Sequence, residues 1–229
     1  LLQSCDVIYV KNEVLDILVL WFLAGRLRII CGVHTAILYP IQRSLRSKLH
    51  NVVYLSRIYG RILKQCSSIH APNRHYLKLI SSRFGIDGSR LFWIPYGVDT
   101  SVFSAKGESP DDELRILFAG RLTEQKGVDV LCKAINILSK RAEFANMDFR
   151  IAGSGELQHL VDELCKKFSN VRYLGYIAND DMPRLYSAHD VVVVPSRWET
   201  GPYACIEPQA CAVPAIASNI SGPDEIVIH

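Results

Sequence analysis

The chain has 229 residues, of which 49% are hydrophobic and 21% are charged, and its formal net charge is +3. A chain of this length and composition can form one large or two small domains with proper cores, and it lacks the signature of a disordered protein. Its most apolar stretch, residues 14–25, contains Asp16 and is shorter than the roughly 20 residues of a membrane span, so we expect a buried helix there. No signal peptide is recognisable, and because the chain begins with Leu1 we expect its true start to lie upstream.

Seven cysteines are scattered along the chain, and none of them forms a C-x-x-C pair. An odd, scattered set is typical of reduced core residues in a cytosolic protein, rather than of a disulfide framework or a zinc site. We therefore expect a cytoplasmic protein.

Charge is divided unevenly between the two halves of the chain. Residues 1–109 contain 14 lysines and arginines against 6 acidic residues, whereas residues 110–229 contain 12 against 17. This asymmetry indicates two units with different surroundings. The basic half is suited to peripheral contact with anionic lipids on the inner face of a membrane, or with a phosphorylated acceptor; a solvated helix surface is an equally good interpretation. No nucleic-acid-binding module is recognisable, so we expect no nucleic-acid partner.

The first half contains two predicted strands, Val7–Val10 and Ile29–Val33, with the helix at residues 14–25 between them. Long helical stretches follow at Leu45–Cys66 and Asn73–Phe84. The alternation of strand and helix is therefore incomplete in this half.

The second half alternates short apolar runs with amphipathic helices more regularly. Val128, Leu131 and Ile135 share one face of its first helix, at the spacing of a core stripe. Strand–helix alternation predicts a parallel, doubly wound sheet. The expected strands are Arg115–Phe118, Phe149–Ala152, Val171–Leu174, Val191–Val194 and Ala215–Ala217, and the expected helices are Val128–Lys140, Leu157–Phe168, Met182–Ala188 and Tyr203–Ala212.

Two glutamates, Glu199 and Glu207, follow the apolar run Val191–Val194, which is typical of a strand buried on both faces. Glu199 is therefore expected at the carboxyl end of a strand, where open parallel sheets bind ligands. Pro202 suits the first position of a helix and Gly201 suits the bend before it, so free helix amides should face the same crevice and bind an anion. The two carboxylates could then hold two hydroxyl-bearing ends of one phosphorylated ligand, although two solvated glutamates on a helix would look the same.

A second motif, GRLTEQKG, follows the strand expected at Arg115–Phe118. Arg121 offers a forked guanidinium and Lys126 a compact ammonium, and the two groups together suit a diphosphate. A capped helix start with an exposed lysine is the alternative interpretation.

These two segments, together with SGPDEIV at Ser221–Val227, resemble the retaining family 4 glycosyltransferases (glycosyl transferases group 1), and the resemblance runs from about Val7 to the end of the chain. It implies an α/β protein of the GT-B fold, with two Rossmann-like, doubly wound parallel-sheet lobes that both look incomplete. Residues 1–103 would be the C-terminal part of the acceptor-side lobe, residues 104–112 the linker, and residues 113–229 the nucleotide-sugar lobe, truncated at its C-terminus. We therefore expect a fragment.

The resemblance also implies roles for individual residues. Arg121 and Lys126 would hold the diphosphate, Glu199 the sugar hydroxyls and Glu207 the ribose, and His34 would lie near the transferred sugar. The residues implied in donor binding are Gly120, Gly153, Gly155, Tyr176, Ile177, Gly201, Tyr203, Ala204 and Glu207.

This sequence departs from the family's pattern at several positions. Gly201-Pro202 replaces the usual Phe-Gly and removes one amide donor, so phosphate would rely on Tyr203 and Ala204. Tyr96 stands where the family usually has Asn. His70 is a weaker candidate than His34 for the histidine near the transferred sugar.

Three acidic residues of the second half are expected to be structural. Asp180 and Asp181 are interpreted as the cap of the helix at Met182 rather than as metal ligands, and Glu225 as the cap of a later helix.

The expected reaction is transfer of a sugar from a nucleotide-diphosphate sugar to an acceptor, which could be a lipid, a polysaccharide or a small molecule, with retention of configuration. We expect no cofactor beyond the donor and no metal. An epimerase or phosphorylase of the same fold, or a truncated nucleotide-binding fragment without activity, remains an alternative.

Overall fold

The structure is a computed structural model, and it describes residues 6–11, 28–34, 45–104 and 113–228. The helix expected at residues 14–25 and most of the expected linker lie outside the described residues. The chain divides into two compact units, Leu1–Tyr96 and Gly97–His229, so the boundary between them falls upstream of that linker. No helix in the described ranges is long and apolar enough to span a membrane.

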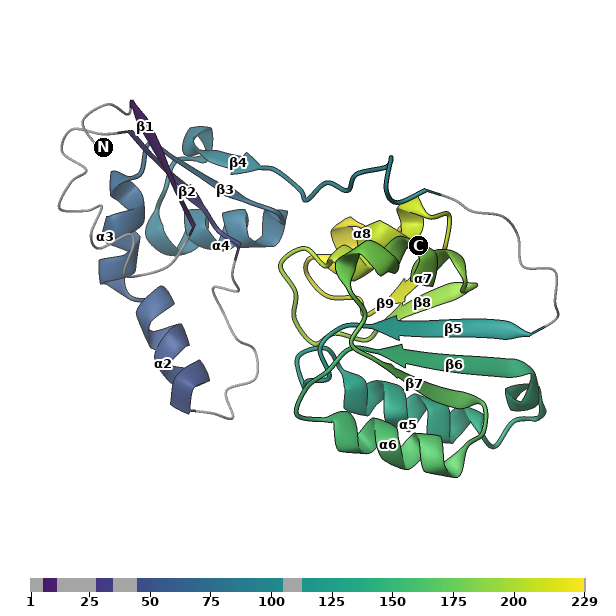
Figure 1. Cartoon of the computed structure of the whole chain (residues 1–229). Coiled ribbons are helices and arrows are strands. Elements are labelled where there is room, and N and C mark those ends of the chain that lie inside the picture. The colour runs from purple at the N-terminus through teal and green to yellow at the C-terminus, as the bar shows by residue number, and fades with distance from the viewer. Residues whose placement is uncertain (1–5, 12–27, 35–44, 105–112, 229) are drawn as a thin grey trace. The chain divides into compact units, whose positions relative to one another are not determined.

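The first unit contains a four-stranded parallel sheet in which the strands pair in chain order (Figure 1). The first two strands were predicted from the sequence. The third and fourth were not, because they have only four and three residues and show no clear alternation. The strands are β1 (Val7–Lys11), β2 (Arg28–Gly32), β3 (Ser68–Ala71) and β4 (Leu91–Trp93).

The helical stretch expected at Leu45–Cys66 is two helices, α2 (Leu45–Tyr54) and α3 (Arg57–Gln65). The break arises at Ser56, which has an extended backbone and whose hydroxyl accepts a hydrogen bond from the backbone N–H of Tyr59. The next helix, α4 (Arg74–Phe84), begins after Asn73, whose side chain caps it in the same way.

The second unit contains a five-stranded sheet with the order β7-β6-β5-β8-β9, and every pairing is parallel. The chain moves outward from β5 to β7 and then returns to the other side of β5, which makes the sheet doubly wound as predicted. The strands are β5 (Leu114–Ala119), β6 (Met147–Ala152), β7 (Val171–Gly175), β8 (Val191–Val194) and β9 (Ala215–Ala217).

Helices cover both faces of this sheet, α5 (Val128–Leu138) and α6 (Gln158–Lys167) on one face and α7 (Met182–Ser187) and α8 (Tyr203–Ala210) on the other (Figure 1). Each face has its own apolar core. Strand β8 was expected to be buried on both faces. Its side chains are fully buried only on the α7–α8 face and partly buried on the other.

The start of α8 and two expected helix caps differ from the sequence prediction. Pro202 is the N-cap of α8 rather than its first residue, and the helix ends at Ala210. Asp181 lies at the N-cap position of α7, but its side chain makes no capping hydrogen bond. Glu225 belongs to a three-residue 3-10 helix, where the Asp224 carboxylate, not Glu225, accepts a hydrogen bond from the Gly222 N–H (3.0 Å).

Candidate functional site

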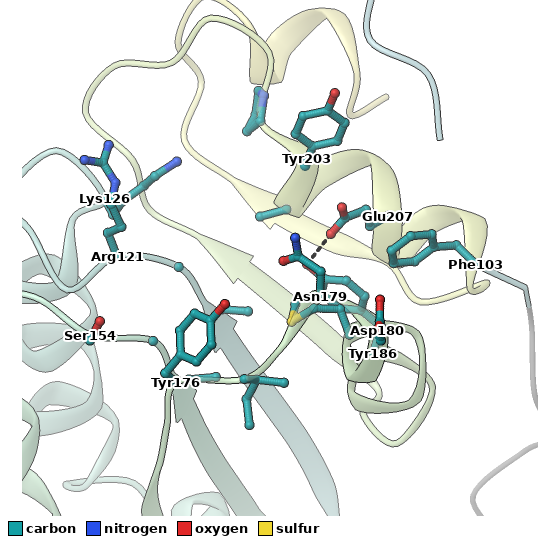
Figure 2. Close-up of a pocket in the computed structure, with 18 of the residues that line it drawn as sticks. Phe103, Arg121, Lys126, Ser154, Tyr176, Asn179, Asp180, Tyr186, Tyr203 and Glu207 are labelled. Atoms are coloured by element: carbon teal, nitrogen blue, oxygen red, sulfur yellow. Dashed lines mark hydrogen bonds between the residues drawn. The ribbon is translucent and has the colours of Figure 1, made fainter. Parts of the chain in front are cut away.

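The second unit has a cavity of about 740 Å³ at the carboxyl ends of its strands (Figure 2). The loops after β5, β6, β7 and β8 line it together with the start of α8. This is where the strand order reverses, between β5 and β8, and open parallel sheets bind ligands at such a point. The volume lies in the range of small-molecule sites, which is about 300–1,000 Å³.

Two basic residues of the loop after β5 line the cavity. The Nζ of Lys126 lies 2.5 Å from Oε1 of Glu199, in the loop after β8. Glu199 is only 7% exposed, and the hydroxyl of Ser196 also donates to its Oε1 (2.8 Å). Arg121 donates to the side-chain oxygen of Gln125 (3.0 Å), and Figure 2 shows the nitrogens of Arg121 and Lys126 on the same side of the cavity. The cavity therefore has a concentration of positive charge next to a buried carboxylate.

The loops after β5 and β8 are fastened to each other by Arg197. Its guanidinium binds both carboxylate oxygens of Asp129 (2.6 and 2.7 Å) and the backbone carbonyl of Glu124 (2.6 Å). This pairing lowers the pKa of Asp129 and raises the pKa of Arg197. Bidentate contacts of this kind fix geometry as well as adding energy, so they hold Lys126 in register with Glu199.

Glycine is required where the loop after β5 meets the loops after β8 and β6. Gly127 has a φ of +71°, and a Cβ at this position would lie 1.9 Å from the backbone oxygen of Pro195. Gly153, in the loop after β6, has a φ of +126°, and a Cβ there would lie 1.8 Å from the backbone oxygen of Gly120. The loops can therefore approach this closely only because both positions lack a side chain.

Glu207, in α8, lines the cavity and is bonded to a buried tyrosine. The hydroxyl of Tyr186 in α7 donates to Oε2 of Glu207 (2.9 Å), as the dashed line in Figure 2 shows, and Tyr186 is 1% exposed. Burial raises the pKa of Glu207, and the hydrogen bond from Tyr186 opposes that increase. The pKa of Tyr186 is raised by burial and by the neighbouring carboxylate, so the phenol remains a donor. Tyr186 thereby orients one oxygen of Glu207.

The start of α8 brings backbone amides to the cavity. Pro202 has no N–H and provides no side-chain cap, and Tyr203 and Ala204 follow it as the first helical residues that line the cavity. Tyr176 and Ile177, after β7, add an aromatic and an aliphatic surface. The cavity therefore combines cations, carboxylates, helix amides and apolar side chains.

Most of the residues predicted for the donor site line this single cavity, and Gly155 and His34 do not. Gly155 lies against the backbone of Leu122, where a Cβ would be 2.4 Å from its oxygen, so its role is close approach of two loops. His34 belongs to the first unit, where it follows β2. The predicted residues in the cavity are Gly120, Arg121, Lys126, Gly153, Tyr176, Ile177, Glu199, Gly201, Tyr203, Ala204 and Glu207.

Sequence reasoning missed several lining residues. Tyr186 belongs to a helix whose apolar side was interpreted only as core, and Asp180 was interpreted only as part of a helix cap. Ser154 could have been found, because it lies between the two glycines of the loop after β6. The other residues missed are Val102, Phe103, Ala119, Ala152, Asn179 and Met182.

A doubly wound sheet with a charged cavity at its switch point places the second unit among the α/β proteins that bind ligands at strand ends. Residues 99–229 match the family model described as glycosyl transferases group 1, and residues 1–102 match the model described as glycosyltransferase family 4. Because the first match covers more than half of the chain, the chain belongs to the glycosyl transferases group 1 family.

Curated relatives agree with this assignment. The chain is 38% identical over 122 residues to an uncharacterised glycosyltransferase of Methanocaldococcus jannaschii, a match that covers 52% of this chain and 30% of the relative. It is 33% identical over 156 residues to the D-inositol 3-phosphate glycosyltransferase of Paenarthrobacter aurescens, which covers 62% of this chain and 38% of the relative. The chain thus spans about a third of the length of these relatives.

Solved structures show the same fold at lower identity. The structure of Anabaena HepE in complex with UDP and glucose matches with a TM-score of 0.73 at 21% identity and covers 98% of this chain and 62% of that one. A sucrose-phosphate synthase of Thermosynechococcus elongatus matches with a TM-score of 0.78 at 22% identity and covers 97% of this chain and 58% of that one. These neighbours are GT-B glycosyltransferases with Rossmann-like lobes, so the predicted fold class is confirmed.

Proposed function

We propose that the chain is part of an enzyme that transfers a hexose from a nucleotide-diphosphate sugar to an acceptor hydroxyl, with retention of anomeric configuration. One observation carries this proposal, namely that Arg121, Lys126, Glu199 and Glu207 line a single cavity. Family membership supports it, and so does the complex of HepE, a protein of the same fold, with UDP and glucose.

Arg121 and Lys126 would neutralise the diphosphate, and the first amides of α8 would add neutral donors. Negative charge grows on the leaving diphosphate as the bond from the anomeric carbon to the phosphate oxygen breaks. Preorganised cations and N–H groups stabilise that charge more than they stabilise the bound donor. The positive charge of the site is thus supplied by the chain's own residues, and the proposed reaction uses no cofactor and no metal.

Glu199 and Glu207 would hold the two ends of the donor. Both contacts of Glu199 use Oε1, so within the described residues its Oε2 has no donor and can accept a sugar hydroxyl. Glu207 keeps Oε1 for the ribose, because Tyr186 binds Oε2. A carboxylate suits both tasks, because it accepts through two oxygens and has no competing donor.

Retention would follow if the acceptor attacks the face from which the diphosphate leaves. A bond forms between the acceptor oxygen and the anomeric carbon, the bond to the diphosphate breaks, and the electron pair stays on the phosphate oxygen. That oxygen then takes the proton of the acceptor hydroxyl. This route requires no dedicated protein base.

The first unit would meet the acceptor, and we propose that the enzyme works in the cytoplasm at the membrane surface. The helices α2 and α3 carry both exposed basic residues, including Arg57 and Arg61, and exposed apolar side chains, namely those of Leu49, Val52 and Ile58. Anionic lipid heads attract such basic groups, while the apolar side chains can enter the interface. The chain should therefore sediment with phosphatidylglycerol vesicles and not with phosphatidylcholine vesicles, and equal sedimentation with both would contradict this contact.

Calorimetry with UDP and with GDP tests the donor site. We expect one of them to bind, and we expect Lys126→Met to weaken that binding on the order of 10- to 100-fold, the cost of a lost charged hydrogen bond. Lys133→Met is the matched control, because Lys133 is an exposed lysine that also faces a carboxylate, that of Asp129 at 3.9 Å. Absence of binding, or equal effects of the two substitutions, would overturn the proposed site.

Product analysis with radiolabelled donors separates the rival functions. A new glycoside supports transfer, whereas an isomerised nucleotide sugar would indicate an epimerase. Phosphorolysis of a glycoside would indicate a phosphorylase of the same fold. Binding without any turnover would indicate a chain that binds nucleotide but is catalytically silent.

A further inference from the structure

Four polar aromatic side chains of the first unit form one hydrogen-bonded chain. The hydroxyl of Tyr9 lies 2.5 Å from Nε2 of His34 and 2.6 Å from Nε2 of His70. The other ring nitrogen of His34, Nδ1, lies 2.9 Å from the hydroxyl of Tyr96. The rings of His34 and Tyr96 are stacked with their planes 8° apart. Both nitrogens of His34 are therefore engaged by phenol groups of its own unit.

The sheet register explains how residues from different strands meet. Gly32 in β2 pairs with Lys11 in β1 and with His70 in β3, so these positions share a row across the sheet. Tyr9, two residues before Lys11, points to the same face. A Cβ at Gly32 would lie 1.9 Å from the Tyr9 hydroxyl and 2.8 Å from Nε2 of His34. The absence of a side chain at Gly32 thus provides the space in which Tyr9 reaches both imidazoles.

The imidazoles of His34 and His70 and the phenol of Tyr9 are uncharged at neutral pH. Burial lowers the pKa of His34, with a further contribution from the charge of Lys11, and burial also lowers the pKa of His70, with a further contribution from His34. Burial raises the pKa of Tyr9. At neutral pH each imidazole therefore carries one proton, and the phenol of Tyr9 keeps its own.

Counting these protons leaves two arrangements. Tyr9 has one hydrogen, so it donates to one imidazole and accepts from the other. In the first arrangement Tyr9 donates to His34, whose proton is on Nδ1, and His70 donates from Nε2. In the second arrangement His34 donates from Nε2 to Tyr9, Tyr9 donates to Nε2 of His70, and the proton of His70 is therefore on Nδ1. His70 is 9% exposed and its Nδ1 is buried without a partner among the described residues. Because a buried N–H without an acceptor is rare, the first arrangement is favoured.

We propose that Tyr9 and His70 are positioning residues that hold His34 in one tautomer, with its proton on Nδ1 and its Nε2 occupied by Tyr9. A saccharide hydroxyl that replaces the Tyr96 hydroxyl would then meet an N–H donor of fixed direction. The part of this inference that concerns a saccharide rests on the proposed function, whereas the tautomer itself does not.

Nitrogen-15 spectra of the histidine-labelled chain, taken above the pKa of its imidazoles, test the tautomer directly. We expect His34 to be protonated at Nδ1 and His70 at Nε2, each as a single species; the signals would be assigned with His34→Gln and His70→Gln. In Tyr9→Phe the His34 ring should become a tautomer mixture, as expected for an exposed histidine such as His75, whereas His70 should keep its proton on Nε2 because its Nδ1 stays buried without an acceptor in the part of the chain that the structure describes. Mixed tautomers in the unaltered chain, or spectra of Tyr9→Phe that do not change, would overturn the proposal.

Tyr54→Phe is the matched control. It removes a hydroxyl from the same unit, at a ring that stacks on His50 with centroids 4.2 Å apart, and it should leave the signals of His34 and His70 unchanged. Gly32→Ala is a second route to the same result, because its methyl group would occupy the position of the Tyr9 hydroxyl while the tyrosine is kept. A change in Tyr54→Phe equal to that in Tyr9→Phe would show a general effect on the unit and contradict the specific role.

Kinetics of Tyr9→Phe link the tautomer to the reaction. We expect kcat to fall on the order of tenfold, because the positioned group loses its orientation, while the KM for the donor stays unchanged, because the donor cavity belongs to the second unit. UDP or GDP binding tests the donor site separately. If the nucleotide binds but the tautomers are mixed, the inference fails and the donor site stands. If the tautomers are fixed but no nucleotide binds, the donor site fails and the tautomer stands.

Discussion

The two units use the same design with different chemistry. Each has parallel strands with polar side chains gathered at one region of the sheet. In the second unit these side chains are charged, with Lys126 against Glu199 and Arg197 against Asp129. In the first unit they are neutral, with Tyr9 between His34 and His70. The difference supports the proposal that the second unit binds a phosphorylated ligand, and it suits the first unit to a ligand bound through hydroxyl groups.

If charged side chains distinguish the second unit from the first, removing the charge of Glu199 should have the largest effect on sugar transfer. Glu199→Gln keeps an acceptor oxygen but removes the partner of Lys126. We expect sugar transfer to fall on the order of 100-fold or more, while UDP or GDP binds as tightly as before or more tightly, because Lys126 is released to the phosphates. Steady-state kinetics with parallel calorimetry would measure both.

Glu156→Gln is the control for this substitution, since Glu156 is an exposed carboxylate in the loop after β6. It should leave transfer unchanged. A parallel loss of nucleotide affinity and transfer in Glu199→Gln would mean that Glu199 only maintains the loop, and would weaken the proposed contact with the sugar.

A pair of glycine substitutions sharpens the comparison at the level of stability. At Gly127 a Cβ would meet the backbone oxygen of Pro195, whereas at Gly32 it would meet the side chain of Tyr9, in both cases at 1.9 Å. Backbone cannot move away as a side chain can, and Gly127 also has a left-handed φ of +71°. We expect Gly127→Ala to lower the free energy of unfolding by more than about 2 kcal/mol and Gly32→Ala by about 1 kcal/mol.

Urea denaturation of the two variants would measure this difference. Gly88→Ala serves as the control, because no atom lies within 4 Å of a Cβ built there. Equal losses for Gly127→Ala and Gly32→Ala would show that the two glycines are not distinguished by what they face.

The smallest expected effect concerns Glu207, a cavity carboxylate that is bonded to a tyrosine hydroxyl, as the two histidines of the first unit are. Burial raises its pKa and the Tyr186 hydroxyl holds that increase down, so Tyr186→Phe should raise the pKa of Glu207 further. A carboxyl with a raised pKa is protonated as the pH falls sooner than an ordinary one, and it then accepts hydroxyls less well. Nucleotide affinity should therefore begin to fall at a higher pH in the variant, with a loss of about fivefold at neutral pH.

Calorimetry from about pH 5 to about pH 8 would follow this shift. A nucleotide that lacks the ribose hydroxyls provides the control, because it should show no difference between Tyr186→Phe and the unaltered chain. The pKa of Glu207 also makes the stability of the fold depend on pH. The raised pKa of Glu207 favours the folded state below the ordinary pKa of glutamate, and this advantage is lost as the pH rises through the folded value. An affinity profile that is identical in the two proteins would remove Tyr186 from the donor site.

Much of the second unit could be predicted because its signals are local. The apolar run Val191–Val194 and the core stripe that begins at Val128 are complete within a few residues. Strands β3 and β4 were missed because four and three residues carry no period. The break at Ser56 was missed because a capping residue inside a helical pattern looks like any other serine.

The site could be located from the sequence, but its internal contacts could not. Parallel strands bring their carboxyl ends to one edge, so motifs that follow strands can be expected to converge. The bond from Tyr186 to Glu207 joins residues 21 positions apart, that from Lys126 to Glu199 joins residues 73 apart, and that from Tyr9 to His70 joins residues 61 apart. No pattern along the chain indicates which particular side chains meet.

The contact between Lys126 and Glu199 has a consequence for the order in which ligands arrive. While the ammonium remains 2.5 Å from the carboxylate, each charge satisfies the other and a free hexose finds only one oxygen of Glu199 open to it. A diphosphate would compete for the ammonium and, by drawing it away, leave Oε1 with Ser196 as its one donor among the described residues, so that Oε1 could also accept a sugar hydroxyl. We therefore expect a monosaccharide to bind weakly alone and more tightly once UDP or GDP is present, so that recognition of the sugar depends on prior recognition of the nucleotide.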